Sequence, residues 1–400
     1  MKLLSPYPAL VLVILALGTI SLVSRIIPLR PDKTRYETID GLRGYLAFFV
    51  FLHHSLIWYY VIHIHVWLRP PLNLYNQFGT TSVAVFFMIT SFLFFSKLID
   101  ARSGSLDWQQ LYIGRVLRIV PLYLLMLGLL LLIVGHISGF TLHESGSKII
   151  SEILEWLVYI QAPINGNDIT GYIVAGVIWS LPFEWMFYCS LPLVGALIFN
   201  IRISIFTSIF TSLGLIGFTM IIYSYYADFA GWWLLTFLGG IIAAFLSQNK
   251  KICLLATTWQ SSVIMLVLLV LAVAFFTDVF SVIPYMCMVL FFIGVACGNS
   301  LFGLLTHRLS RIFGQITYSM YLLHGILLFV TFNYIIIPSK AILFSPLQHW
   351  FVLAGCSVAL VIICSLTYYY LERPFQKAAG ITALWLRRRL SSDTFRPPSL

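Results

Sequence analysis

The chain has 400 residues, of which 60% are hydrophobic and only 10% are charged, and its formal net charge at pH 7 is +10. So few charged side chains could not cover the surface of a water-soluble domain, which excludes the ordinary soluble classes. The composition therefore predicts an all-α, polytopic helical bundle in a lipid bilayer. The basic residues follow the connections between apolar runs, so the charge does not indicate a nucleic-acid partner.

Apolar runs long enough to cross a bilayer as helices recur along the chain. The eleven predicted spans are 9–28, 41–62, 80–98, 119–138, 178–199, 203–223, 229–247, 260–277, 280–299, 314–337 and 350–371. If the segment before Asp40 is cytoplasmic and the sides alternate, the basic residues left outside are Lys2, Arg69, Lys148 and Lys340. This asymmetry predicts the topology, because cytoplasmic loops carry an excess of Lys and Arg.

The first run, 9–28, has two interpretations. Lys2, an apolar core and small residues before Arg25 are typical of a signal peptide. Cleavage there would leave the basic residues from Arg25 to Arg35 outside, against the charge pattern. We therefore expect an uncleaved helix with an external N-terminus.

The second run begins with DGLRGYLAFFVFLHH, from Asp40 to His54. At about 100° per residue, Arg43 and His54 share one helical face, and His54 lies about 16 Å deeper. Such a stripe suits a long, thin ligand such as an acyl-CoA, with its phosphates at Arg43 and its thioester near His54. The imidazole titrates near working pH and could serve as a general base. The alternative is an arginine that snorkels beside Asp40 and a histidine hydrogen-bonded between helices.

Two later segments carry further charged candidates. In RVLRIVPLY, Arg115 and Arg118 lie on one face and could bind phosphates, although flanking of a span by positive charge explains them equally well. In WSLPFEWMFY, Glu184 lies about two turns into a span and Tyr188 one turn deeper. A carboxylate there could orient an imidazole or bind hydroxyl groups of an acceptor, or it could be a protonated side chain bonded to a neighbouring helix.

Polar residues near the middle of other spans are less specific. Ser91, in FFMITSFLFF, could line a substrate site or satisfy a nearby carbonyl. His324, in YSMYLLH, could line an active site or make a packing contact between helices. His63 and His65 lie at the outer end of a span without a third ligand, so no metal site is predicted.

The regions outside the spans are short. The longest external loop, 139–177, contains apolar residues at helical spacing over 147–160, which predicts a helix on the outer surface. The last residues, 387–400, are expected to form a disordered basic tail. The predicted division is an N-terminal helix and basic linker at 1–35, a membrane domain at 36–376 and a basic tail at 377–400.

Taken in order, these segments resemble the acyltransferase 3 family of integral-membrane acyltransferases. The resemblance covers residues 36–375 and rests on IDGLRG with Arg43 and His54, and on FFMITSFL, RVLRIVPLY, WSLPFEWMFY, YSMYLLH and ERPF. It implies a ten-helix acyltransferase core, here with one extra N-terminal helix. It also implies that His54 is the essential histidine, that Arg43 is its partner, and that Arg115 and Arg118 lie on the acyl-CoA side. The usual Ser-Gly pair of the family reads Thr90-Ser91 here, which adds bulk where a glycine would allow close approach.

The predicted function is that of an O-acyltransferase, with acetyl-CoA as the expected donor and no metal. His54, Arg43 and Glu184 are the predicted catalytic residues; Arg43, Arg115 and Arg118 are predicted to bind the donor; and Ser91, Tyr188 and His324 are predicted to line the acceptor site. The expected acceptor is a cell-surface polysaccharide or lipid-linked glycan, such as the O-antigen of lipopolysaccharide.

The location and the activity leave alternatives open. The external loops contain no N-x-S/T sequence, which favours a bacterial cytoplasmic (inner) membrane. A small molecule or a lipid is the alternative acceptor. A transporter or flippase is the alternative class, against which stands the absence of two similar halves in the sequence.

Overall fold

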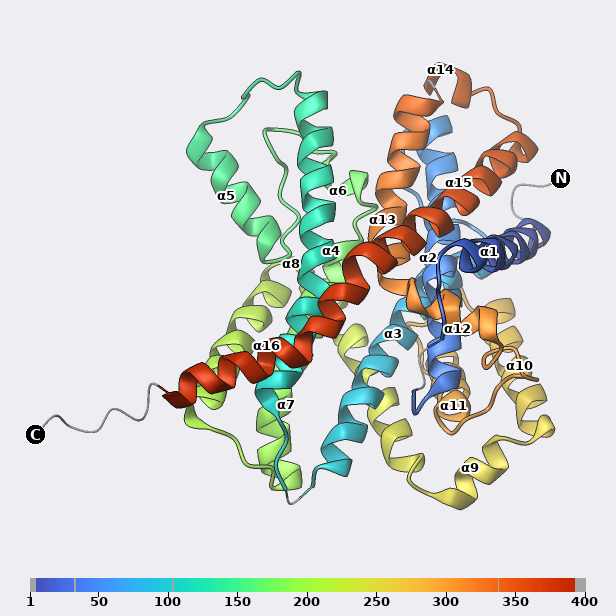
Figure 1. Cartoon of the computed structure of the whole chain (residues 1–400). Coiled ribbons are helices and arrows are strands. Elements are labelled where there is room, and N and C mark those ends of the chain that lie inside the picture. The colour runs from blue at the N-terminus through green and yellow to red at the C-terminus, as the bar shows by residue number, and fades with distance from the viewer. Residues whose placement is uncertain (1–4, 32–33, 103, 337, 393–400) are drawn as a thin grey trace, which may run out of the picture.

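The computed structural model describes residues 5–31, 34–102, 104–336 and 338–392, and within them it is all-helical, with no sheet. The α-helices are α1 (Tyr7–Ile26), α2 (Glu37–Ile64), α3 (Asn73–Asp100), α4 (Trp108–Ile137), α5 (Gly146–Leu157), α6 (Thr170–Ile173), α7 (Ser180–Phe199), α8 (Ile205–Leu246), α9 (Lys250–Ala256), α10 (Trp259–Phe275), α11 (Val282–Ala296), α12 (Arg308–Gln315), α13 (Thr317–Val330), α14 (Pro338–Ala341), α15 (Pro346–Thr367) and α16 (Arg373–Ser392). A 3-10 turn, η1 (Val177–Trp179), precedes α7, and two π-helical turns, η2 (Thr331–Ile335) and η3 (Tyr368–Glu372), follow α13 and α15. Figure 1 shows their arrangement.

Helices α2 and α3 form the centre of the bundle. They pack against each other and against α8, α12 and α13, and most of their residues are buried. Glycines let α2 and α12 meet backbone to backbone: a Cβ added at Gly44 would lie 2.6 Å from the carbonyl carbon of Phe313, and one added at Gly314 would overlap the carbonyl of Asp40. Small residues at such crossings are typical of membrane helices. This contact fixes the part of α2 that carries Arg43.

The protein is a polytopic membrane protein, as predicted. Eight helices in the described part of the chain are long and apolar enough to cross a bilayer, or nine if α9 and α10, which are bent by 72°, form one span. The prediction of eleven separate spans is wrong for three of the predicted segments. The runs 203–223 and 229–247 both lie in the single helix α8, and the run 280–299 forms α11, whose 15 residues fall short of the usual span length.

Helix α8 accommodates two predicted spans because it folds back along α7. A straight helix would separate Gly214 from Phe245 by about 46 Å. Instead, Gly214 packs against Cys189 and Phe245 against Phe199, and these two residues of α7 are only about 15 Å apart along their helix. The two arms of α8 therefore run in opposite directions beside α7. Helix α8 contains no proline and stays one helix through the bend. The sequence therefore contains no helix-breaking residue that would mark where the bend lies.

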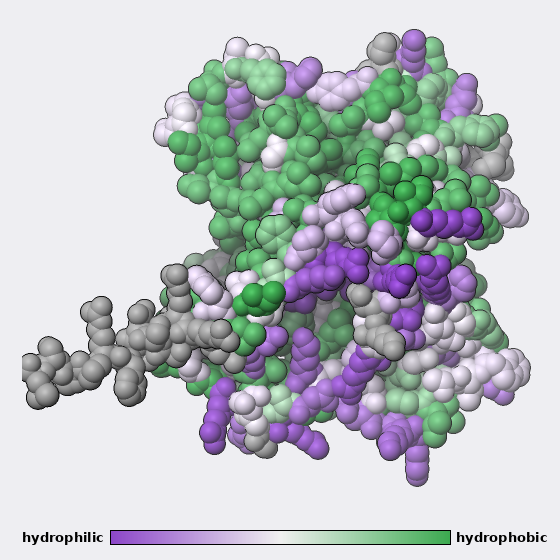
Figure 2. Space-filling model, in the orientation of Figure 1, coloured by the Kyte–Doolittle hydropathy of each residue, from purple (hydrophilic) through white to green (hydrophobic). Residues whose placement is uncertain are grey.

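Hydrophilic side chains gather at one end of the bundle. Figure 2 shows them over the lower part, around the ends of α3, α7 and α9, whereas the part above, around α4 and α5, is largely hydrophobic. Two contacts hold the basic connections together at this end: Arg35 pairs with Asp100, and the Trp108 indole donates to the Arg202 carbonyl at 3.3 Å. We call it the basic end.

The peripheral helices include one correction. Helix α5 agrees with the helix predicted over 147–160, and α1 packs its buried face against α15. The tail predicted to be disordered over 387–400 is instead helical to Ser392, because α16 continues the helix of α15 and η3. The rest of that predicted segment lies outside the described residues. The predicted division of the chain into three parts stays a prediction.

Candidate active site

One unbroken helix, α2, carries both residues of the predicted stripe. Arg43 lies in its second turn and His54 about 16 Å further along the axis. They line two different cavities: Arg43 lines one toward the basic end, and His54 lines one toward the connection between α2 and α3. We call these the arginine cavity and the histidine cavity.

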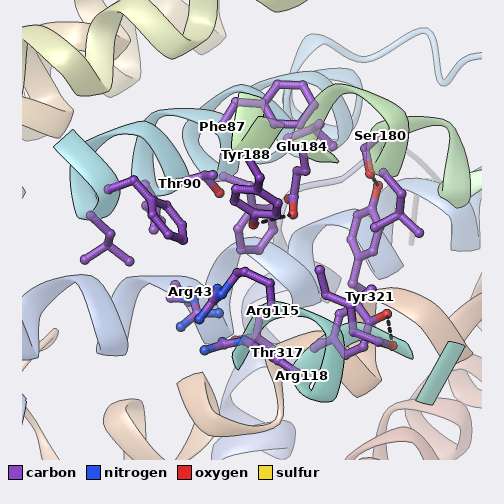
Figure 3. Close-up of a pocket in the computed structure, with 18 of the residues that line it drawn as sticks. Arg43, Phe87, Thr90, Arg115, Arg118, Ser180, Glu184, Tyr188, Thr317 and Tyr321 are labelled. Atoms are coloured by element: carbon purple, nitrogen blue, oxygen red, sulfur yellow. Dashed lines mark hydrogen bonds between the residues drawn. The ribbon is translucent and has the colours of Figure 1, made fainter. Parts of the chain in front are cut away.

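The arginine cavity has a volume of about 320 Å³ and collects cationic side chains from three helices. Lys97 comes from α3. Arg43 comes from α2, and Arg115 and Arg118 come from α4 (Figure 3). Among the described residues, none of these four cations lies within 4.0 Å of a carboxylate oxygen. Uncompensated guanidinium groups in a half-buried site favour an anionic ligand, and their planar forks match phosphate.

Glu184 and Tyr188 line the arginine cavity together with these cations, and Tyr188 lies beside Arg115. Tyr188 donates a hydrogen bond of 3.0 Å to the Glu184 carboxylate, and both side chains come from α7 (Figure 3). The expectation that Glu184 orients the imidazole of His54 has no support in this geometry, because the two side chains line different cavities. The carboxylate instead lines the same cavity as the arginines.

A smaller cavity of about 130 Å³ leads from the basic end toward these arginines. Arg43, Arg118 and Asp40 line both cavities, and Asp40 accepts a hydrogen bond from Thr34. A ligand that enters here meets guanidinium groups before it reaches the interior of the bundle.

His54 is hydrogen-bonded to a second histidine. The Nδ1 atom of His54 lies 3.1 Å from the Val50 carbonyl oxygen and 3.0 Å from Nε2 of His324, and Nδ1 of His324 lies 2.9 Å from the Met320 carbonyl oxygen. Carbonyl oxygens only accept, so both Nδ1 atoms carry hydrogens. With both rings neutral, the single Nδ1 hydrogen of His54 is shared between the Val50 carbonyl and Nε2 of His324, and Nε2 of His54 keeps its lone pair. His54 therefore has the tautomer that a general base requires.

The histidine cavity has a volume of about 250 Å³ and is lined by polar and aromatic side chains. They include His53, Arg69, Asn76, Trp179 and Trp233. His53 itself is occupied elsewhere: its Nδ1 donates to the Tyr75 carbonyl at 2.8 Å, and its ring packs directly against Gly79. Both neighbouring histidines thus use Nδ1 for a backbone carbonyl, and His54 differs in that its Nδ1 also contacts His324.

Ser91 is not among the described residues that line either cavity; its neighbour Thr90 lines the arginine cavity. The Ser91 hydroxyl is fully buried, donates to the Phe87 and Met88 carbonyls of its own helix, and packs on Gly240 of α8. The structure therefore shows the local carbonyl contact that was the alternative for this residue. Gly240 on the facing helix α8 leaves room for the Ser91 side chain, which stands where the family usually has a glycine.

Sequence reasoning missed several lining residues. Tyr321 and Val83 line both cavities, and Trp67 packs on the His54 ring with a centroid distance of 6.0 Å. Tyr321 lies on the same helix as His324, one turn earlier, and this spacing could have signalled it. Val83 carries no chemical signal in the sequence.

These features together define a class: a polytopic membrane protein that can hold an anionic ligand at one end and present a neutral, oriented imidazole in its interior. The comparison with protein families matches residues 36–369 to an acyltransferase domain, and the chain belongs to the acyltransferase 3 family. The protein is thus a membrane acyltransferase, which confirms the predicted resemblance and favours it over the transporter alternative. Comparisons with curated proteins and with solved structures found no match.

Proposed function

We propose that the protein is an O-acyltransferase that moves an acetyl group from acetyl-CoA, bound from the basic end, to a hydroxyl group of a glycan. One observation carries this proposal: arginines without a carboxylate partner and a histidine with a free Nε2 lie about 16 Å apart along one helix. That arrangement suits a donor with phosphates at one end and a thioester at the other.

The arginine cavity would hold the donor. Arg43, Arg115 and Arg118 would bind phosphate oxygens through charge-assisted hydrogen bonds, and Lys97 would add a fourth positive charge. Glu184 would accept a hydrogen bond from an amide N–H group of the pantetheine arm as the arm passes. The arm would then direct the thioester toward His54.

His54 would act as the general base. Its Nε2 takes the proton of the acceptor hydroxyl while the hydroxyl oxygen attacks the thioester carbonyl carbon. The tetrahedral intermediate collapses, the carbon–sulfur bond breaks, and the imidazolium returns the proton to the departing thiolate of CoA. The products are an O-acyl ester and free CoA, and the two neutral histidines are restored.

Aromatic and polar groups beside His54 support a glycan as the acceptor. Trp67 packs on both His54 and Tyr172, with centroid distances of 6.0 Å and 5.0 Å. These two aromatic residues line a further cavity of about 250 Å³ together with Gln161 and Asp168. A sugar ring offers an apolar face to aromatic rings and hydroxyl groups to amide and carboxylate oxygens. We propose a surface polysaccharide or a lipid-linked glycan such as O-antigen in a bacterial cytoplasmic membrane, with a small molecule or a lipid as the alternative acceptor.

The test uses native host cells that lack the chromosomal copy and are complemented with wild-type protein, His54→Ala or His63→Ala. NMR of the surface polysaccharide measures O-acetyl groups, and blots confirm equal protein in the membranes. We expect the signal from wild type and from His63→Ala, whose ring hydrogen-bonds backbone carbonyls, stacks on Tyr59 and lines none of the cavities described above, and loss of the signal from His54→Ala. Equal signal from all three would remove His54 from the mechanism, and no signal from any would exclude this acceptor.

A further inference from the structure

The arginine cavity and the histidine cavity meet at two side chains. Among the described residues, Val83 of α3 and Tyr321 of α13 are the ones that line both. The groups that would hold the donor therefore lie on one side of this pair, and the His54 ring lies on the other. We call Val83 and Tyr321 the partition.

Helix α3 passes from one cavity to the other at Val83. Gly79 and Thr80 line the histidine cavity, whereas Phe86, Phe87 and Thr90 line the arginine cavity. These positions follow one face of the helix at the usual spacing of three and four residues. Val83 lies at the midpoint of this face, and its side chain is 6% exposed.

Tyr321 is held in place by its hydroxyl group. It donates to the Val177 carbonyl of η1 at 2.9 Å and lies 3.0 Å from the hydroxyl of Ser180, the first residue of α7. Figure 3 shows Tyr321 and Ser180. Its ring makes edge contacts with Phe86 and His324, with centroid distances of 6.2 Å and 6.4 Å. Two hydrogen bonds at the tip of a half-buried ring hold it across the boundary, yet they can be broken without unfolding a helix.

Because the two cavities meet at this boundary, a donor bound by the arginines would reach His54 across it. General-base catalysis requires the acceptor oxygen to lie within hydrogen-bond reach of His54 Nε2, about 3 Å, and the thioester carbon must lie equally close to that oxygen. His54 lines the histidine cavity and not the arginine cavity. The acyl group must therefore enter the histidine cavity. The acyl group is the leading end of the pantetheine arm, so it meets the partition first.

We propose that the partition is the passage for the acyl-pantetheine arm and that the size of residue 83 limits which acyl group is transferred. Tyr321 leaves Val177 and Ser180 when the arm enters and returns when free CoA withdraws. Val83 stays in place on α3 and sets the remaining width. This inference rests on the proposed function, because it assumes a thioester donor bound at the arginines and a base at His54.

The test compares wild type, Val83→Ala, Val83→Phe and Val85→Ala in purified membranes of the native host, which supply the acceptor. Transfer of labelled acyl groups to the acceptor fraction is measured with acetyl-, butyryl- and hexanoyl-CoA, and binding of labelled CoA is measured in parallel. Val85 is the matched control, since it is also a buried valine of α3 but lines neither cavity among the described residues.

We expect Val83→Phe to bind CoA as wild type does and to lose acetyl transfer by about tenfold or more, because a ring added at the passage excludes the acyl group. We expect Val83→Ala to raise the ratio of butyryl to acetyl transfer by about tenfold, and Val85→Ala to leave this ratio unchanged. If Val83→Phe fails to bind CoA, the inference is tested by the ratio of butyryl to acetyl transfer in Val83→Ala alone.

Two results would overturn the inference and leave the proposed function intact. One is acetyl transfer by Val83→Phe at the wild-type rate, and the other is an unchanged chain-length ratio in Val83→Ala while wild type transfers acetyl normally. Absence of transfer by the wild-type protein would overturn the proposed function, and this inference with it.

Discussion

At the scale of single residues, the pairing of His54 with His324 solves a problem that the bilayer creates. A base in the interior of a membrane protein needs a partner that fixes its tautomer, and in soluble enzymes this partner is commonly a carboxylate. A carboxylate is costly at that depth. His324 provides the same hydrogen-bond acceptor without a charge, and the Met320 carbonyl in turn fixes the tautomer of His324.

This geometry makes His324 a positioning residue. We expect His324→Ala to lower kcat by about 10- to 10²-fold, because His54 then loses one of the two acceptors that hold its Nδ1 hydrogen and orient its ring, and only the Val50 carbonyl remains. The KM for acetyl-CoA should change little, since His324 does not line the arginine cavity. Steady-state kinetics with membranes of matched protein content measure both constants.

The conservative variant separates positioning from packing. The side-chain oxygen of Gln in His324→Gln can accept the hydrogen bond from His54, so this variant should recover part of the lost kcat. A kcat for His324→Ala equal to that of wild type would contradict the assigned role.

At the scale of elements, one glycine of α13 fixes the segment between α5 and η1, beside the site. A Cβ added at Gly325 would lie 2.6 Å from the Ala175 nitrogen and would overlap the Val174 carbonyl group. Ala175 and Gly176 follow in the left-handed region, with φ of 53° and 64°, and Gln161 donates to the Gly176 carbonyl at 3.1 Å. The contact of Gly325 with Val174 and Ala175 therefore joins the cavity lined by Trp67 and Tyr172 to α13, the helix that carries His324.

We expect Gly325→Ala to destabilise the protein and to displace this segment. Replacement of glycine by alanine inside a helix normally stabilises it by up to about 1 kcal/mol. Here the added methyl group would meet backbone, which cannot rotate away as a side chain can. Thermal unfolding in detergent should therefore show a lower Tm for Gly325→Ala.

The control for this prediction is Gly128→Ala in α4, where an added Cβ has nothing within 4 Å. Its Tm should equal or slightly exceed that of wild type. Equal Tm values for Gly325→Ala and wild type would show that the segment is not held by this contact.

At the scale of the whole molecule, the basic end predicts the orientation in the membrane. The connection between α3 and α4 lies at that end, whereas α5 follows the opposite end of α4. We expect a membrane-impermeant maleimide to label Ser147→Cys on α5 in intact cells and to label Ser105→Cys only after permeabilisation. Both native serines are exposed, so accessibility should depend on the side of the membrane alone. The reverse pattern would contradict the topology and place the arginine cavity outside.

The fold was predictable where each helix has its own apolar run, as α2 and α3 do. It was less predictable where the chain bends without a break, as in α8, because hydropathy shows two runs but not whether helical hydrogen bonding continues between them. It was unpredictable for α16, whose basic composition resembles that of a disordered tail, although the helix also packs against α4.

The site shows the same limit. Arg43 and His54 could be related from the sequence because they share one helix, whose geometry is fixed. The contacts of Glu184 and His324 depend on which helices are neighbours. The sequence therefore left open whether Glu184 orients the base or the acceptor, and it did not predict that His324 is bonded to His54. Val83 could not be found at all, because its importance comes from position rather than from chemistry.

The partition has a consequence for the electrical insulation of the membrane. A protein that takes one substrate from each side contains a recess open toward each aqueous phase, and a permanent water-filled connection between them would let protons and ions cross. Val83 and Tyr321 separate the two recesses at the point where they meet. Under the proposed function, we expect this separation to preserve the energy stored in the gradient, about 2.3 kcal/mol per charge at 100 mV, while the enzyme is idle.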